Sequence, residues 1–284
     1  MLRQRVITAI VLLAILLPAL FWPSPYPFSA VVLVLIAGAG WEWGRLNGLA
    51  FGPSLVVGVV CLVLCMGSWS AGLIEKPLGL LWAIVGAAWV VGGALLLNRG
   101  VAGWPHIPRS VRLPAGVLAL WAAWLAASQA RFIGINFLLS VLVLVWVADI
   151  AAYAAGRTFG LKFTKEKLAP TISPGKSWEG AWGGIVGVLV LGIAWAFADR
   201  QLGANGASLY TRLEHTAWWL LPIAAVFLTA MSVVGDLTES LVKRSAGMKD
   251  SSNLLPGHGG VLDRVDALLP VLPLSMFITG LLLP

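Results

Sequence analysis

Two segments, 157–179 and 236–266, are rich in charged side chains although only 11% of the chain is charged. In the second segment, two carboxylates, a hydroxyl and an ammonium recur at helical spacing and therefore share one helix face: Asp236, Glu239, Ser240 and Lys243. Asp263 and Asp266 lie on a single turn further along. Mg²⁺ takes carboxylate oxygens together with substrate phosphates. We therefore predict a metal site formed by Asp236 and Asp263. The alternative is a set of salt bridges with the neighbouring lysines and arginines.

The loop between these acids reads PGHGG over 256–260. Glycines such as Gly259 and Gly260 let backbone amides approach a ligand closely. Three roles are open to His258: contact with phosphate, proton transfer, or bracing of the loop. Zinc is not expected, because the three histidines of the chain lie far apart and no cysteine is near them.

Asp149 ends a long apolar run, in WVADIAAYAAGR. A carboxylate in such a run costs about 2.5–3.5 kcal/mol on membrane-insertion scales, so it marks a functional site by default. Tyr153 lies one turn further along the same helix face. We predict that Asp149 supports a metal or orients a ligand. An ion pair with Arg157 is the alternative.

The stretch SPGKSWEG, 173–180, combines a lysine with hydroxyls at the expected start of a helix. Pro174-Gly175 predicts a turn, and Ser177 predicts a helix N-cap. Because a helix N-terminus attracts anions, we predict phosphate or substrate contacts here, from Ser173, Lys176, Ser177 and Glu179. A P-loop is excluded because proline occupies position 170, where glycine is required. For Lys162, Lys165 and Lys167, ordinary loop charge is an equally good interpretation.

The elements that carry these residues are predicted to lie in a membrane. Mean hydropathy is +0.91, and 284 residues include only 19 basic and 12 acidic ones. Nine runs approach the roughly 20 apolar residues of a membrane span: 6–22, 28–46, 53–74, 78–97, 113–129, 133–155, 180–198, 216–235 and 267–283. We predict an all-α, polytopic integral membrane protein with a single domain over 1–284. Residues 1–148 form a scaffold, and residues 149–284 form a catalytic half with cytoplasmic loops at 156–179 and 236–266.

Basic residues predict the orientation of these spans. With a cytoplasmic N-terminus, fifteen Lys and Arg fall in one set of loops and four in the other, namely Lys76, Arg131, Arg200 and Arg212. Such a bias predicts that the richer side is cytoplasmic. The net charge of +7 then favours anionic lipid or substrate at that face, and not nucleic acid.

Two features of the first 70 residues receive structural interpretations. A signal peptide is the alternative for the first run, but Phe21, Trp22 and Pro23 stand where small residues would be cleaved. We therefore expect a retained helix. Cys61 and Cys65 share a helix face with no acid or histidine nearby, so we expect small packing residues and no metal or redox pair.

The motif S-L-V-K-R-x4-K-D-x-S-x2-L-P-x-H-G-G-V-x-D-R-V-D, from Ser240 to Asp266, resembles the signature of the phosphatidate cytidylyltransferases, or CDP-diacylglycerol synthases. Asp149 to Gly160, 173–180 and Gly235 to Ser240 resemble the same family. The N-terminal half is similar only in its apolar helices and a Trp41-Glu42-Trp43 element.

The resemblance implies an enzyme of phospholipid biosynthesis that joins CTP and phosphatidic acid into CDP-diacylglycerol and releases pyrophosphate. It implies Mg²⁺, allows a second, monovalent cation such as K⁺, and suggests a homodimer among the lipids of a bacterial inner membrane. Asp236 and Asp263 would bind metal, with Asp266 and Asp149 in support. The phosphates would be held by basic side chains, namely Lys176, Lys243, Arg244, Lys249 and Arg264.

Two other functions compete with this one. A CTP-dependent polyprenol or dolichol kinase also joins a nucleotide to a membrane lipid, but it passes on only the γ-phosphate. An ion-coupled transporter also carries acids within the membrane, but its two halves should be related. Here the polar residues are concentrated in one half, which argues against a transporter.

Overall fold

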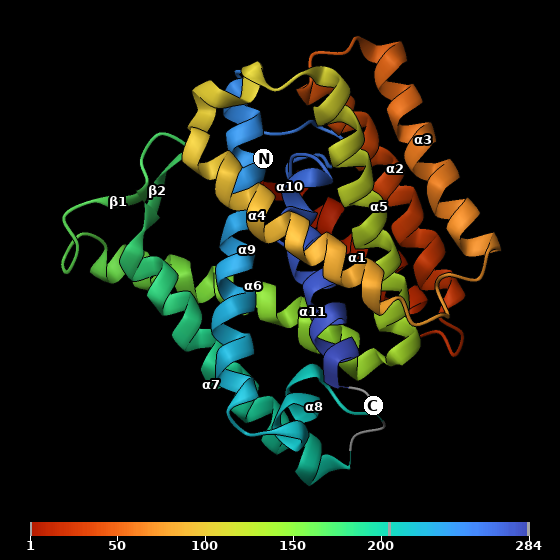
Figure 1. The fold of residues 1–284 in the computed structure, drawn as a ribbon, viewed down its shortest axis with the longest axis vertical. Helices are drawn as coiled ribbons and strands as arrows, with labels where there is room; N and C mark the ends of the chain where they lie inside the picture. Colours follow the sequence, from red (N-terminus) through yellow and green to blue (C-terminus); the bar gives the residue numbers. More distant parts are fainter. Residues whose placement is uncertain (1, 204–205, 283–284) are drawn as a thin grey trace.

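The computed structural model describes residues 2–203 and 206–282, which are almost entirely helical (Figure 1). Its elements in chain order are α1 (Leu2–Phe21), α2 (Tyr26–Leu46), α3 (Phe51–Ser70), α4 (Gly79–Gly103), the short 3₁₀ helix η1 (Trp104–His106), α5 (Arg109–Ile133), α6 (Ile135–Phe159), β1 (Lys167–Ala169), β2 (Ser173–Ser177), α7 (Trp178–Leu202), α8 (Leu209–Thr216), α9 (Leu220–Ser245), α10 (Leu262–Val265) and α11 (Leu268–Leu282). Within the described residues, nine helices are long and apolar enough to cross a membrane. The predicted all-α, multi-pass architecture is confirmed.

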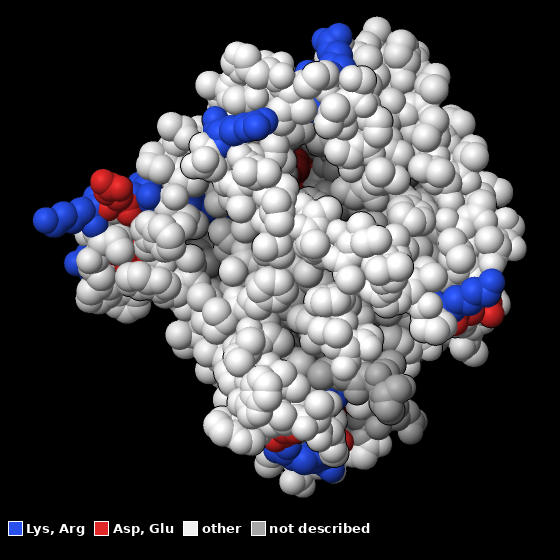
Figure 2. All heavy atoms as spheres, viewed as in Figure 1, with Lys and Arg blue, Asp and Glu red and all other residues white. Residues whose placement is uncertain are grey.

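The helices form two groups that share a central pair, α4 and α11. In Figure 1, α2, α3 and α5 lie on one side and α6, α7, α8 and α9 on the other. Between them, α11 packs against α4, α5 and α9, and α4 also packs against α9. The face shown in Figure 2 is almost uncharged, and its Lys, Arg, Asp and Glu side chains gather mainly towards the margins. This is the distribution expected when lipid surrounds the middle of the bundle.

Small residues bring α6 and α7 close together. A Cβ added at Gly183 of α7 would lie 2.2 Å from Ala155 Cβ of α6, and one added at Gly187 would lie 2.6 Å from Ala151 Cβ. Helices in lipid gain no hydrophobic free energy from packing against each other, so close backbone approach through Gly and Ala is their usual contact. This contact fixes one wall of the site described below.

The pair α2 and α3 packs in the same way. Cys61 and Cys65 are free thiols and fully buried, and a Cβ added at Gly40 would lie 2.8 Å from Cys61 Sγ. The two cysteines are therefore small packing residues, as predicted from their surroundings.

The segment before α7 differs from its prediction. Strands β1 and β2 pair in antiparallel fashion, with Lys167 opposite Ser177 and Ala169 opposite Ser173. The predicted turn at Pro174-Gly175 is wrong, because both residues lie inside β2 and the chain reverses over 170–172. Proline is tolerated here because a two-stranded hairpin consists only of edge strands.

Helix α9 continues to Ser245, past the predicted end of the eighth span at 235. Side-chain pairs one turn apart support this polar extension: Ser240 Oγ donates to Asp236 Oδ1 over 3.2 Å, and Lys243 Nζ lies 2.5 Å from Glu239 Oε2. The predicted polar helix face is therefore confirmed.

Candidate active site

A cavity of about 440 Å³ lies between α6, α7, α9 and the β1-β2 hairpin. Small residues of α6 and α7 form much of its wall, since no large side chain fits where these helices touch. The polar lining includes five residues whose roles were predicted from the sequence: Asp149, Ser173, Lys176, Ser177 and Asp236. Tyr153 and Arg157 join them, and Arg157 Nη1 donates to Tyr153 Oη over 3.2 Å. The structure thus brings α6, the hairpin and α9 to one cavity.

An ion pair connects the hairpin to α9 across this cavity. Lys176 Nζ of β2 lies 2.5 Å from Asp236 Oδ2, and both side chains remain partly exposed, by 26% and 28%. Ser177 follows Lys176 and caps α7, because its Oγ accepts from Gly180 N over 3.1 Å. The predicted N-cap is therefore confirmed, and it places Lys176 at the start of α7 facing α9.

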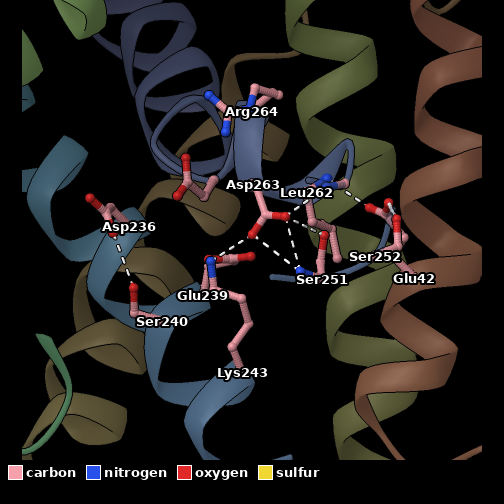
Figure 3. A network of polar contacts seen from close by, with 12 residues as sticks. Glu42, Asp236, Glu239, Ser240, Lys243, Ser251, Ser252, Leu262, Asp263 and Arg264 are labelled. Atoms are coloured by element: carbon pink, nitrogen blue, oxygen red, sulfur yellow. Dashed lines mark hydrogen bonds and ion pairs between the residues drawn. The ribbon is translucent and has the colours of Figure 1, made fainter. Parts of the chain in front are cut away.

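A second charge cluster lies further along α9 (Figure 3). Lys243 Nζ is 2.5 Å from Glu239 Oε2 and 2.6 Å from Asp263 Oδ1. These three side chains are only 13%, 6% and 5% exposed. Glu239 Oε1 is buried and accepts no hydrogen bond within the described part of the chain. The cluster is thus a nearly buried lysine between two carboxylates, with one carboxylate oxygen left over.

Asp263 also organises the loop before it. Its Oδ2 accepts from Gly260 N over 2.7 Å, from Ser251 N over 3.0 Å and from Ser251 Oγ over 2.9 Å. Gly259 has a φ of +83°, a conformation that favours glycine. The glycines predicted to bring backbone amides towards a ligand therefore direct one of those amides, Gly260 N–H, at a carboxylate of the protein itself.

His258 lies on the outer part of this loop. Its backbone N donates to Leu255 O over 2.8 Å, and its carbonyl oxygen accepts from Nε and Nη2 of Arg264, over 3.0 and 2.7 Å. Its ring Nδ1 is buried and has no hydrogen-bond partner among the described residues. In this structure Arg264 braces the loop, and the ring of His258 leaves one nitrogen unused.

The sequence of the chain matches known proteins over nearly its whole length. The model of the cytidylyltransferase family covers residues 3–282. The chain belongs to the cytidylyltransferase family. Phosphatidate cytidylyltransferase of Pseudomonas aeruginosa is 38% identical over 96% of this chain and 95% of its own. The enzyme of the same name from Haemophilus influenzae is 39% identical over 96% of both chains. That of Staphylococcus epidermidis is 40% identical over 51% of this chain and 50% of its own. The chain is therefore a nucleotidyltransferase.

Besides the cluster around Lys243 and the loop that carries Asp263, four further predicted residues lie outside the cavity lining. Glu179 is buried at the base of the hairpin, where its Oε1 accepts from Phe163 N, Thr164 N and Thr164 Oγ1. Asp266 accepts from the next backbone amide, Ala267 N, over 2.8 Å. Arg244 and Lys249 are exposed and form no ion pair within the described ranges. Their predicted contacts with substrate stay predictions.

Sequence reasoning gave no role to Glu42 of α2, although this side chain contacts the loop that carries Asp263. Glu42 is fully buried and accepts hydrogen bonds from Ser252 Oγ, Val261 N and Leu262 N. The sequence contained a signal for a role of Glu42, because a carboxylate inside an apolar span is as costly at position 42 as at position 149.

The predicted metal ligands do not form a closed metal site. In the part of the chain that the structure describes, no group of three or more His, Cys, Asp or Glu side chains is placed to hold a metal ion. Asp236 is paired with Lys176, and Asp263 with Lys243. An Mg²⁺ ion held by one or two carboxylates and by substrate phosphates needs no such group.

Proposed function

We propose that this chain transfers CMP from CTP to phosphatidic acid, giving CDP-diacylglycerol and pyrophosphate. A phosphate oxygen of phosphatidate would attack the α-phosphorus of CTP. The bond from that phosphorus to the bridging oxygen would break, so that pyrophosphate leaves. The names of the full-length relatives support this choice of substrates. The observation that carries it is the cavity between α6, α7 and α9, where Lys176 and Asp236 face each other between the helices of a membrane bundle.

The basic side chains of the site suit two polyanionic substrates that repel each other. Lys176 and Arg157 line the cavity, and Lys243 lies on the next turns of α9. Each can neutralise phosphate charge and hold two phosphates in line. Because the nucleophile is already an anion, the reaction needs positioning and charge neutralisation and no strong general base. The composition of the site supports this mechanism.

The donor atoms also fit a hard cation. We infer that Asp236 and Asp263 hold Mg²⁺ together with the nucleotide phosphates, and that a monovalent cation such as K⁺ accompanies it. Glu239 Oε1 is buried beside Lys243 and Asp263 and has no hydrogen-bond partner among the described residues, which supports this inference because a buried carboxylate oxygen without a partner is costly. When bound, Mg²⁺ would neutralise charge that develops on the phosphates.

We further propose that the active site faces the cytoplasm in a bacterial inner membrane, that the N-terminus is on the same side, and that the enzyme is a homodimer. The charge bias of the loops supports the orientation. Contacts within the bundle agree with it, because the start of α1 and the ends of α2 and α4 all meet the region around 245–262.

One assay of the purified protein tests the reaction. CTP labelled at either the α- or the γ-phosphorus is incubated with phosphatidate vesicles, with and without Mg²⁺, and dCTP is run in parallel. We expect α-label in the lipid, pyrophosphate in solution, and no transfer without Mg²⁺. Transfer of γ-label alone would identify a lipid kinase instead. Uptake into liposomes without turnover would identify a transporter.

A further inference from the structure

Glu42 connects the N-terminal half of the chain to the loop of the candidate active site. Its side chain is 0% exposed on α2. Oε1 accepts from Ser252 Oγ over 2.5 Å and from Val261 N over 2.9 Å, and Oε2 accepts from Leu262 N over 2.8 Å. The donors lie 210 to 220 residues further along the chain. Figure 3 shows Glu42 reaching this loop from α2, on the side opposite Asp236.

The contact depends on a carboxylate. Among the described residues, no Lys, Arg or His forms an ion pair with Glu42, so its charge is stabilised by the three loop donors. A buried charge is tolerated only while such donors remain in place. If the loop moved away, the carboxylate would lose its partners, so Glu42 favours the observed position of the loop.

Two carboxylates hold three consecutive amides of this loop. Asp263 accepts from Gly260 N, and Glu42 accepts from Val261 N and Leu262 N. The approach is so close that a Cβ added at Gly260 would lie 2.3 Å from Glu42 Oε1 and 2.0 Å from Ser251 Oγ. The position of Asp263, and through it of Lys243, therefore depends on where Glu42 holds the start of α10.

We propose that Glu42 is a positioning residue for nucleotidyl transfer. By holding Ser252, Val261 and Leu262, it fixes the loop that carries Asp263 and keeps that carboxylate beside Lys243. Glu42 itself does not contact substrate. This role rests on the proposed function, and it means that the N-terminal half determines active-site geometry as well as membrane anchoring.

The test compares Glu42→Gln with Asp199→Asn in the full chain. Asp199 is a matched control, because it too accepts hydrogen bonds from several segments, namely from Asn136 Nδ2, Ser208 N and Thr211 Oγ1. It lies at the far end of α7. Both variants are assayed for kcat and KM with CTP and phosphatidate. Amide hydrogen exchange is followed over 252–262 and over α6 and α7.

In Glu42→Gln we expect kcat to fall by about 10²-fold, the loss typical of a misplacement near 1 Å, with KM changed by less than about threefold. Exchange should rise at Val261 and Leu262 and stay unchanged in α6 and α7. Asp199→Asn should leave both kcat and loop exchange unchanged. Glu42→Asp should recover part of kcat because it keeps the charge.

Three results would overturn the proposal: wild-type kcat in Glu42→Gln, unchanged exchange at Val261 and Leu262, or a rise in exchange throughout the bundle. If Glu42→Gln does not fold, Ser252→Ala removes one donor and should give a smaller loss of kcat with faster exchange at the loop. If the wild type itself transfers no CMP, the proposed function fails, whereas the exchange measurement still tests the contact.

Discussion

Lys176 of β2 and Asp236 of α9 form an ion pair, with 2.5 Å between Nζ and Oδ2, that joins the hairpin to the wall of the cavity. Because about a quarter of each side chain is exposed, solvent screens the pair and it adds little to stability. Under the proposed mechanism, a substrate phosphate would replace Asp236 as the partner of Lys176, and a cation would replace Lys176 as the partner of Asp236.

We expect Lys176→Met to lower kcat/KM for CTP by about 10²-fold, the usual effect of removing one preorganised donor, while the melting temperature stays unchanged. Lys165→Met is the control, because Lys165 is exposed just before β1 and outside the cavity lining. Radiolabelled product and thermal unfolding in detergent are the measurements. An equal loss in both variants would mean that only the net charge of the hairpin matters.

Asp263→Asn should lower both activity and stability. The side chain is 5% exposed and accepts from Lys243, Ser251 and Gly260, so we expect about 1–3 kcal/mol less stability from unsatisfied buried donors and a loss of pyrophosphate release. The control is Asp250→Asn, an exposed carboxylate in the same loop. Wild-type pyrophosphate release by Asp263→Asn would contradict its proposed metal role, and an unchanged melting temperature would contradict its structural role.

A Gly→Ala substitution in the close contact of α6 and α7 should lower stability, whereas one at an open position of α4 should not. At Gly183 the new methyl group would lie 2.2 Å from Ala155 Cβ, so we expect a loss of about 1–3 kcal/mol. At Gly92 of α4 it would meet no atom within 4 Å, so the lower entropy of the unfolded chain should leave stability unchanged or raised by up to about 1 kcal/mol. Thermal unfolding in one detergent compares them, and equal shifts would show that this contact does not control stability.

The proposed orientation predicts which cysteines a membrane-impermeant maleimide reaches. Cysteine introduced at Asn253, which is exposed between α9 and α10, should react only in inside-out vesicles. Cysteine introduced at Glu75, between α3 and α4, should react only in right-side-out vesicles. Cys61 and Cys65 are buried and should stay silent in both. The reverse pattern would place the active site on the other side of the membrane.

The sequence by itself determined the local features of this protein. Apolar runs predict nine membrane spans because a span is set by the length and hydropathy of consecutive residues, and nine helices of the described residues meet these criteria. The polar face from Asp236 to Lys243 follows from the helix repeat. Ser177 caps α7 through a hydrogen bond from Gly180, only three residues further along the chain. The polar face and the cap depend on neighbours within about two turns, and a span depends on a run of about 20 consecutive residues.

Only the tertiary structure decided which distant groups meet. Glu42 binds donors more than 200 residues away, and Lys176 of β2 pairs with Asp236 of α9. Glu179 accepts hydrogen bonds from the backbone N and Oγ1 of Thr164 at the base of the hairpin, a contact that no spacing rule predicts. Such contacts depend on how helices pack through Gly and Ala, and on where each buried carboxylate finds the donors it needs. For that reason the sequence identified most of the polar residues of the site, whereas the fold determined how they are paired.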